Sequence, residues 1–122
     1  MVIDHPIFLE SIRFIRSHLR VNDLSYLEKK VLERLVHTSG DFSVQNLINF
    51  SEGACEQGLQ ALKNGAPILT DTDMAAAAIK SMAEKTTRNK VFTARMWFGK
   101  NIHTNLTKTA YGLSEGWKEY PL

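Results

Sequence analysis

The side chain best suited to proton transfer is His37, which follows a helical pattern and stands beside two hydroxyls and a carboxylate. Residues 35–41 read LVHTSGD. Because an imidazole changes charge near neutral pH, a histidine on such a polar turn is a candidate general acid or base. His37 also lies off the apolar stripe of its helix, so we do not expect a core histidine. The alternative is that it serves only as a favourable cation at the carbonyl end of the helix dipole.

Two amphipathic helices must position this histidine. Pro6 suits the first turn of one helix, whose apolar stripe is interrupted by Ser11. A hydroxyl on such a stripe either bonds the carbonyl one turn back or lines a cavity. Ser25 and Glu28 form a capping-box pattern for the second helix, and Gly40 provides its left-handed stop.

The remaining sequence predicts a parallel α/β arrangement. A helix lies between Ser51 and Gly65, an apolar strand covers 66–70, an alanine-rich helix begins after a cap at 71–73, and a second strand covers 91–94. A strand, helix, strand order implies a right-handed crossover between parallel strands. We also expect a helix over 104–113, capped by Thr104 or Asn105. The fold class is therefore α/β, with a parallel or mostly parallel sheet flanked by helices in three layers.

Size and composition limit the classes of protein to which this chain can belong. The 122 residues fit one domain, 1–122, and 43% hydrophobic with 23% charged residues is ordinary for a globular protein. A single cysteine, Cys55, excludes an internal disulfide. The apolar runs are too short for a membrane span, and the first residues do not resemble a signal peptide. We expect a cytoplasmic protein that does not enter a membrane.

Positive charge is concentrated near the C-terminus. Residues 84–122 contain seven Lys or Arg against three Glu, although the net charge of the chain is only +2. Such a segment can meet an anionic ligand or partner, or simply form a solvated surface. Within it, residues 95–100 read RMWFGK, which is either a stacking platform for a flat ligand or an edge of the core. The net charge does not call for nucleic acid.

Several common catalytic motifs are absent from the sequence. It contains no phosphate-binding glycine loop, no nucleophile-elbow serine and no zinc-type Cys/His spacing. Its four histidines are scattered along the chain, so we expect no metal.

Blocks of the sequence resemble the precorrin-8X methylmutases in order and spacing. The blocks are HPI at 5–7, ESIRFI at 10–15, VHTSGD at 36–41, NL at 46–47 with FS at 50–51, Ala54 with GL at 58–59 and AL at 61–62, and GAPILTD at 65–71 with Met74. The resemblance runs from His5 to about Ile79 and is thinner afterwards.

This resemblance implies an isomerase of cobalamin biosynthesis. Such an enzyme moves a methyl group from C-11 to C-12 of a tetrapyrrole, giving hydrogenobyrinic acid or its cobalt-containing counterpart. It also implies an α/β homodimer, or a higher oligomer, with active sites near the subunit boundary. His37 stands at the position of the family's catalytic histidine, and Ser11 matches a serine expected to line the same pocket.

The implied chemistry needs little from the protein beyond binding and a proton. An intramolecular methyl shift requires no nucleophile, redox cofactor or catalytic metal, so we expect no cofactor. A charged His37, favoured at a helix end, would protonate or hydrogen-bond the ring system, a contribution of about 10²–10⁴-fold. Further substrate-binding candidates, mostly counterions for the substrate's carboxylates, are Thr38, Arg88, Lys90, Arg95 and Lys108.

The sequence also departs from the family pattern. Family members are longer, and their last strand and final helix have no counterpart here. Lys108 lies where the family often has arginine, which would lose bidentate carboxylate binding. Three hypotheses therefore stay open: the isomerase, a non-catalytic tetrapyrrole-binding remnant, and a basic oligomerising domain that binds an anionic partner through residues 85–108. The sequence does not decide between cobalt-containing and cobalt-free substrates.

Overall fold

The computed structural model describes residues 4–99 and 105–121. It divides into an N-terminal unit that ends at Gln60 and a C-terminal unit that begins at Ala61. Each unit is described by itself below, and the assignment of residues 1–122 to one domain stays a prediction. Where the structure describes the chain, no helix combines the length and apolarity needed to cross a bilayer.

The two helices expected in the N-terminal unit are confirmed. Helix α1 spans Pro6–His18, and the His5 side chain caps it by accepting the Ile7 N–H at 3.2 Å. Helix α2 spans Tyr26–Ser39 and begins with the predicted capping box of Ser25 and Glu28. Gly40 ends α2 in the left-handed region, with φ at 68°. Local sequence signals thus fix both ends of α2.

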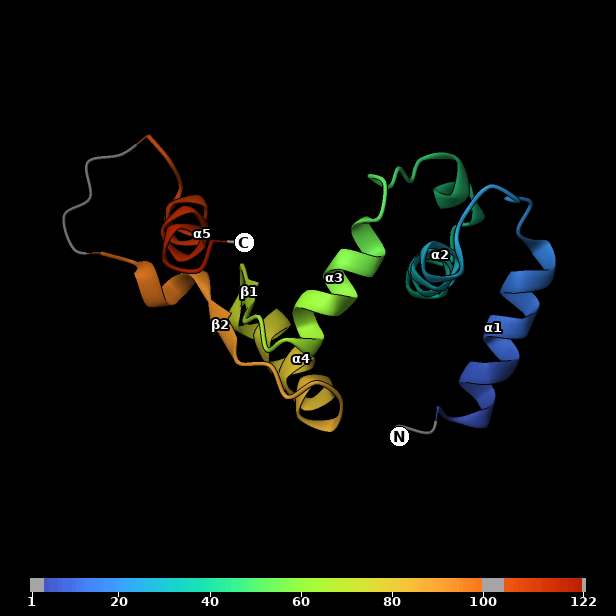
Figure 1. The fold of residues 1–122 in the computed structure, drawn as a ribbon, viewed down its shortest axis with the longest axis horizontal. Helices are drawn as coiled ribbons and strands as arrows, with labels where there is room; N and C mark the ends of the chain where they lie inside the picture. The colour runs from blue at the N-terminus through green and yellow to red at the C-terminus, as the bar shows by residue number, and fades with distance from the viewer. Residues whose placement is uncertain (1–3, 100–104, 122) are drawn as a thin grey trace. The chain divides into compact units, whose positions relative to one another are not determined.

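Helices α1 and α2 cross steeply and bury a small apolar core between them (Figure 1). Leu32 and Val36 of α2 are completely buried, and Ile12 and Ile15 of α1 pack against them. A short 3₁₀ helix, η1 (Phe42–Asn46), packs against α2 and contributes partly buried apolar side chains. Apolar burial of this kind stabilises the crossing at about 25 cal/mol per Å² removed from water.

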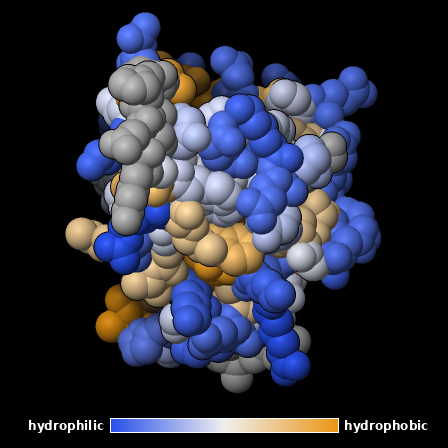
Figure 2. Space-filling model, turned by 90° about the vertical axis from the view of Figure 1, so that its left-hand side faces the viewer, coloured by the Kyte–Doolittle hydropathy of each residue, from blue (hydrophilic) through white to orange (hydrophobic). Residues whose placement is uncertain are grey.

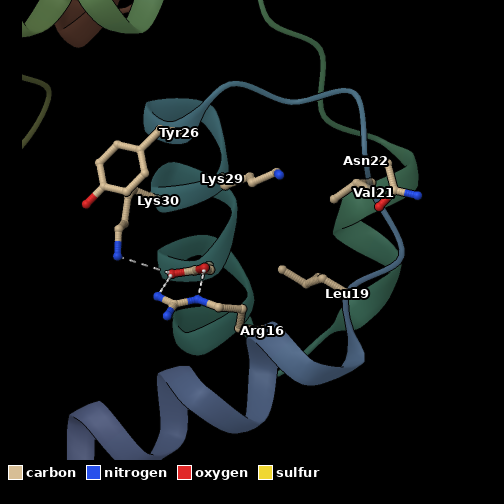
Figure 3. A pocket seen from close by; sticks show the side chains of 8 residues that line it. Arg16, Leu19, Val21, Asn22, Tyr26, Lys29 and Lys30 are labelled. Atoms are coloured by element: carbon tan, nitrogen blue, oxygen red, sulfur yellow. Dashed lines mark hydrogen bonds and ion pairs between the residues drawn. The ribbon is translucent and has the colours of Figure 1, made fainter.

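A bidentate ion pair closes one side of this crossing. Arg16 of α1 donates from Nε to Glu33 Oε1 at 2.8 Å and from Nη2 to Oε2 at 3.1 Å. Lys30 lies 4.0 Å from the same carboxylate, and Figure 3 shows both cations directed at it. Glu33 is only 4% exposed. Its buried negative charge is therefore stabilised mainly by these two cations rather than by water.

The C-terminal unit has the predicted parallel strand pair. Strand β1 (Ile68–Thr70) pairs with β2 (Val91–Thr93), in a register that sets Ile68 opposite Val91. Helix α3 (Ala54–Lys63), which begins in the N-terminal unit, precedes β1 in the chain. Helix α4 (Asp73–Lys85), capped by Thr72, connects the two strands. The strands lie between α4 and α5 (Lys108–Glu119) in Figure 1, which confirms a small parallel sheet flanked by helices.

The helix expected over 104–113 is displaced. The structure places α5 at Lys108–Glu119, and Thr107 caps it by accepting the Ala110 N–H at 3.2 Å. The proposed cap at Asn105 is therefore wrong, and Thr104 lies outside the described residues. Gly112 and Gly116 lie inside α5, although glycine is unfavourable in a helix interior. Both glycines are buried inside α5, because its backbone lies directly against neighbouring elements.

Glycine at these two positions permits close packing within the C-terminal unit. A Cβ added at Gly112 would collide with the carbonyl oxygen of Ala94, in the 3₁₀ helix η2 (Ala94–Trp97). A Cβ at Gly116 would lie 2.9 Å from Leu69 Cδ2 and 3.0 Å from the Trp97 ring. Figure 2 shows the side of the molecule on which α5 lies in Figure 1, where apolar side chains gather between hydrophilic ones.

Replacing Gly112 with alanine tests this close approach. We expect Gly112→Ala to lower the free energy of unfolding by about 1–3 kcal/mol, because the added methyl group meets backbone that cannot move aside freely. Urea denaturation followed by tryptophan fluorescence reports on this unit, since Trp97 and Trp117 both belong to it.

The matched control is Gly58→Ala in α3, where an added Cβ meets nothing within 4 Å. Helix propensity alone predicts that this change is neutral or stabilising, by up to about 1 kcal/mol. Its unfolding is followed by circular dichroism. A Gly112→Ala protein as stable as the parent would show that α5 does not rest on the Ala94 backbone.

Candidate functional site

The crossing of α1 and α2 brings Ser11 and His37 together. Ser11 Oγ lies 2.9 Å from His37 Nδ1, although the two residues are 26 positions apart. The Ser11 side chain is half-buried and His37 is exposed, so the ring faces solvent rather than the core. This confirms that His37 is not a core histidine, and it pairs the two residues that the resemblance had assigned to one pocket.

The polar residues next to His37 in sequence have other partners. Ser39 Oγ donates to the Leu35 carbonyl at 2.7 Å and accepts the Asp41 N–H at 3.2 Å. Asp41 accepts the Ser43 N–H at 2.8 Å and caps η1, and hydrogen bonds from the side chain and backbone of Ser43 lower its pKa. Ser39 and Asp41 therefore make hydrogen bonds at the C-terminal end of α2. The hydroxyl that contacts the imidazole is that of Ser11, on α1.

Phe8 and Ser11 together restrict the orientation of the imidazole. The Phe8 ring lies edge-on to His37, with centroids 4.9 Å apart and planes at 81°. Aromatic pairs favour this T-shaped arrangement. Because Ser11 occupies Nδ1, proton exchange with a bound ligand is directed through Nε2. When the ring is charged, its Nδ1–H can donate to the serine oxygen.

Arg34 is a site residue that sequence reasoning missed. Its guanidinium carbon lies 4.1 Å from the centroid of the Phe8 ring, and its Nη2 lies 3.6 Å from Asp4 Oδ1. Stacking on an aromatic face orients a guanidinium while leaving donors for a carboxylate. The available signal was its spacing, since Arg34 and His37 are three residues apart on one helix face.

A cavity of about 350 Å³ opens beside this cluster. It is lined by Asp4, Phe8, Leu9, Ile12, Arg16, Lys30, Glu33 and Arg34. This volume lies at the lower end of the range for small-molecule pockets. It can take an arm of a larger ligand, so a macrocycle at His37 would rest on the open surface rather than inside an enclosed pocket.

The other predicted binding residues occupy separate places. Thr38 follows His37 on the exposed side of α2. Arg88, Arg95 and Lys108 belong to the C-terminal unit, where all three are exposed. Arg88 has a positive φ of 57°, Arg95 Nη2 lies 3.2 Å from Asp73 Oδ2, and Lys108 is the first residue of α5. Their contact with substrate stays a prediction.

Trp97 of the RMWFGK segment lies at an edge of the C-terminal core, whereas Phe98 is exposed. The Trp97 ring lies 6.2 Å from the ring of Phe92 and 6.5 Å from that of Tyr120, and its Nε1 donates to Glu119 at 2.7 Å. Lys100 lies outside the described residues. These contacts favour the core-edge interpretation over a stacking platform. Over residues 4–99 and 105–121, no group of three or more His, Cys, Asp or Glu side chains could hold a metal ion.

Fold and site together define a class: an α/β protein whose candidate active centre is a hydroxyl-paired imidazole on crossed helices. The family profile of precorrin-8X methylmutase (CbiC) matches residues 6–121. The chain belongs to the precorrin-8X methylmutase family.

Individual relatives agree with this membership. The chain is 25% identical over 133 residues to a cobalt-precorrin-8 methylmutase of Synechocystis, covering 98% of this chain and 61% of that protein. It is 33% identical over 61 residues to a protein of the same name from Methanocaldococcus jannaschii, covering 50% of this chain and 29% of the relative. The precorrin-8X methyl mutase crystal structure from Thermus thermophilus aligns with a TM-score of 0.74 and 28% identity, over 93% of this chain and 55% of that one. The chain thus spans at most about three fifths of these relatives.

The acid response of the Arg16–Glu33 pair is a testable property of the site's framework. The Arg16 hydrogen bonds hold the pKa of Glu33 below its usual value of 4.5, although burial opposes this. A lowered folded-state pKa gives stability that is present above pH 4.5 and is lost as pH falls through the folded-state pKa. We expect Glu33→Gln to be about 1–3 kcal/mol less stable than the parent at pH 7, with a difference that shrinks toward pH 3.

Urea denaturation at several pH values, followed by circular dichroism, measures this difference. The control is Glu10→Gln on the exposed side of α1, which should stay close to the parent throughout. If Glu33→Gln lowers the free energy of unfolding by the same amount at pH 7 and at pH 3, the ion pair is not the cause of the pH dependence of stability.

Proposed function

We propose that this protein is an isomerase that moves a methyl group from C-11 to C-12 of precorrin-8X or cobalt-precorrin-8, with His37 as the proton donor. The observation that carries the proposal is the 2.9 Å contact between Ser11 Oγ and His37 Nδ1. It gives an exposed imidazole a fixed partner at Nδ1 and leaves Nε2 as the nitrogen for a ligand. Membership of the family supplies the reaction class.

The reaction balances without an external reactant. The bond from C-11 to the methyl carbon breaks while the bond to C-12 forms, and the electrons rearrange within the conjugated ring. His37 Nε2–H donates a proton or a hydrogen bond to a ring nitrogen while the methyl group moves. The proton returns to Nε2 as the product tautomer forms, so the enzyme ends in its starting state. General acid catalysis of this kind contributes about 10²–10⁴-fold.

Ser11 acts on this step through the imidazole. Its oxygen can accept from Nδ1–H when His37 is charged, which keeps Nε2 directed at the substrate. Phe8 limits rotation of the ring from the other side. Arg34, stacked on Phe8, is placed to pair with a carboxylate arm of the substrate.

The size of the substrate affects which oligomeric state could enclose it. A cavity of about 350 Å³ covers only part of a tetrapyrrole. We therefore propose that a homodimer or higher oligomer provides further walls. We also propose that the protein acts in the cytoplasm.

Turnover by His37 variants tests the proton-donor role. We expect His37→Ala to lower kcat by about 10²–10⁴-fold while hydrogenobyrinic acid still binds, since the lost group acts mainly in the transition state. Conversion is followed by the change in absorbance of the tetrapyrrole. Lys29→Gln, an exposed change on α2, is the control.

Three results separate the hypotheses. A His37→Ala protein that converts substrate at the parent rate would remove the histidine from the mechanism. A parent protein that binds hydrogenobyrinic acid without any conversion of precorrin-8 would favour a non-catalytic binding remnant. A parent protein that binds neither, and shows steep salt-dependent binding to nucleic acid, would favour the anionic-partner hypothesis.

Ser11→Ala tests the positioning role of the hydroxyl. Loss of one hydrogen bond, about 0.5–1.5 kcal/mol, should lower kcat by roughly twofold to tenfold and leave KM nearly unchanged. The control is Ser81→Ala, an exposed serine of α4 in the C-terminal unit. Equal kcat values in Ser11→Ala and the parent would contradict this role.

A further inference from the structure

A second histidine on α1 is held in a defined orientation and has no part in the proposed reaction. His18 Nδ1 lies 2.8 Å from the Phe14 carbonyl oxygen and 2.9 Å from Ser17 Oγ. Because a carbonyl can only accept and the Ser17 hydroxyl already donates to it, the Phe14 contact favours the tautomer with the hydrogen on Nδ1. The ring is thereby fixed on the last turn of the helix, with Nε2 as its second polar atom.

Three rings from α1 and η1 gather around this histidine. The Phe14 and His18 rings lie 4.2 Å apart at 32°, and Phe42 lies 6.5 Å from Phe14 and 5.9 Å from His18. We call Phe14, His18 and Phe42 the aromatic shelf. Phe14 remains 58% exposed, so a large part of this surface is open to a ligand. Exposed aromatic faces of this kind favour stacking with flat molecules.

The shelf forms part of a cavity whose other polar lining is one guanidinium and two side-chain amides. The cavity has a volume of about 500 Å³ and is lined by Phe14, His18, Arg20, Val21, Phe42, Gln45 and Asn46. None of these residues carries a carboxylate. Gln45 Oε1 accepts the Arg20 N–H at 2.9 Å, which leaves the Gln45 amide nitrogen as a donor toward other groups. Aromatic rings, a guanidinium and amide donors together select a flat anion.

The aromatic shelf lies on the same face of α1 as the candidate catalytic residues. Ser11 and His18 are seven residues apart, which is two helical turns, or about 10 Å along the axis. A small ligand at His37 would not reach the shelf, whereas a large flat ligand with peripheral arms would. The shelf and the Ser11–His37 pair can therefore contact one molecule at two points.

We propose that the aromatic shelf and Arg20 bind the rim of the tetrapyrrole, by stacking against the ring system and pairing with one of its peripheral carboxylates. This inference rests on the proposed function and adds the residues that determine affinity. His37 serves the chemical step beside Ser11, near the middle of α1, and the shelf holds the substrate at the C-terminal end of that helix. Its residues position the substrate and do not take part in proton transfer.

The test uses the full chain and compares hydrogenobyrinic acid affinity with the kinetics of conversion. Phe14→Leu removes the ring at an exposed position, and we expect roughly twofold to tenfold weaker binding. Arg20→Gln removes the charge and should weaken binding by about tenfold. Both changes should raise KM and leave kcat at saturating substrate unchanged. Arg20→Lys, which keeps the charge but loses the planar fork, should fall between the parent and Arg20→Gln.

Arg13→Gln is the matched control, because Arg13 is an exposed cation on α1 that does not line the cavity. Parent-like affinity and KM in both Phe14→Leu and Arg20→Gln would overturn the inference and leave the proposed function intact. Affinity lost equally in Arg13→Gln would also overturn it, because general charge would then explain the effect. If the parent neither binds nor converts the tetrapyrrole, the proposed function itself fails, and this is seen before any variant is made.

Discussion

The crossing of α1 and α2 is held by an ion pair that burial makes costly to break. Glu33 is almost fully buried, and Arg16 satisfies both of its oxygens. Removing either partner would leave an uncompensated charge or lost hydrogen bonds at the helix contact. With the apolar core around Leu32 and Val36, this pair fixes how α1 lies across α2. The 2.9 Å contact between Ser11 and His37 follows from that geometry, because the two residues lie on different helices and meet only where the helices cross.

Local signals in the sequence were sufficient for the boundaries of α1 and α2, whereas the strands expected over 66–70 and 91–94 are longer than β1 and β2. The capping box at Ser25 and the left-handed Gly40 set the ends of α2, and short apolar runs gave both strands and their parallel order. The start of α5 was misplaced because Thr104, Asn105 and Thr107 can all cap a helix, and only the structure shows that Thr107 does so. The place of Gly112 inside this helix could not be predicted either, because helix propensity is local, whereas its close approach to the Ala94 backbone depends on a partner distant in the chain.

The candidate site was predictable in its chemistry but not in its contacts. The residue types identified His37 as a candidate, and the family resemblance identified Ser11. Ser39 and Asp41, which lie next to His37 in sequence, instead make hydrogen bonds to nearby backbone groups. Arg34 and the aromatic shelf were missed, because stacking on Phe8 or around His18 depends on how helices pack. A surface arranged in this way suits a ligand larger than any single cavity, held by contacts spread along one helix.

The most direct test of this account is the imidazole nitrogen NMR spectrum of His37, recorded with and without hydrogenobyrinic acid. The geometry predicts that Nδ1 reports the Ser11 hydrogen bond already in the free protein and changes little on binding, whereas Nε2 shifts as the ligand arrives. His5, whose Nδ1 caps α1, provides an internal reference that should not move. If the ligand binds while both His37 nitrogens stay unchanged, or if only Nδ1 shifts, the imidazole does not face the tetrapyrrole and the account is contradicted.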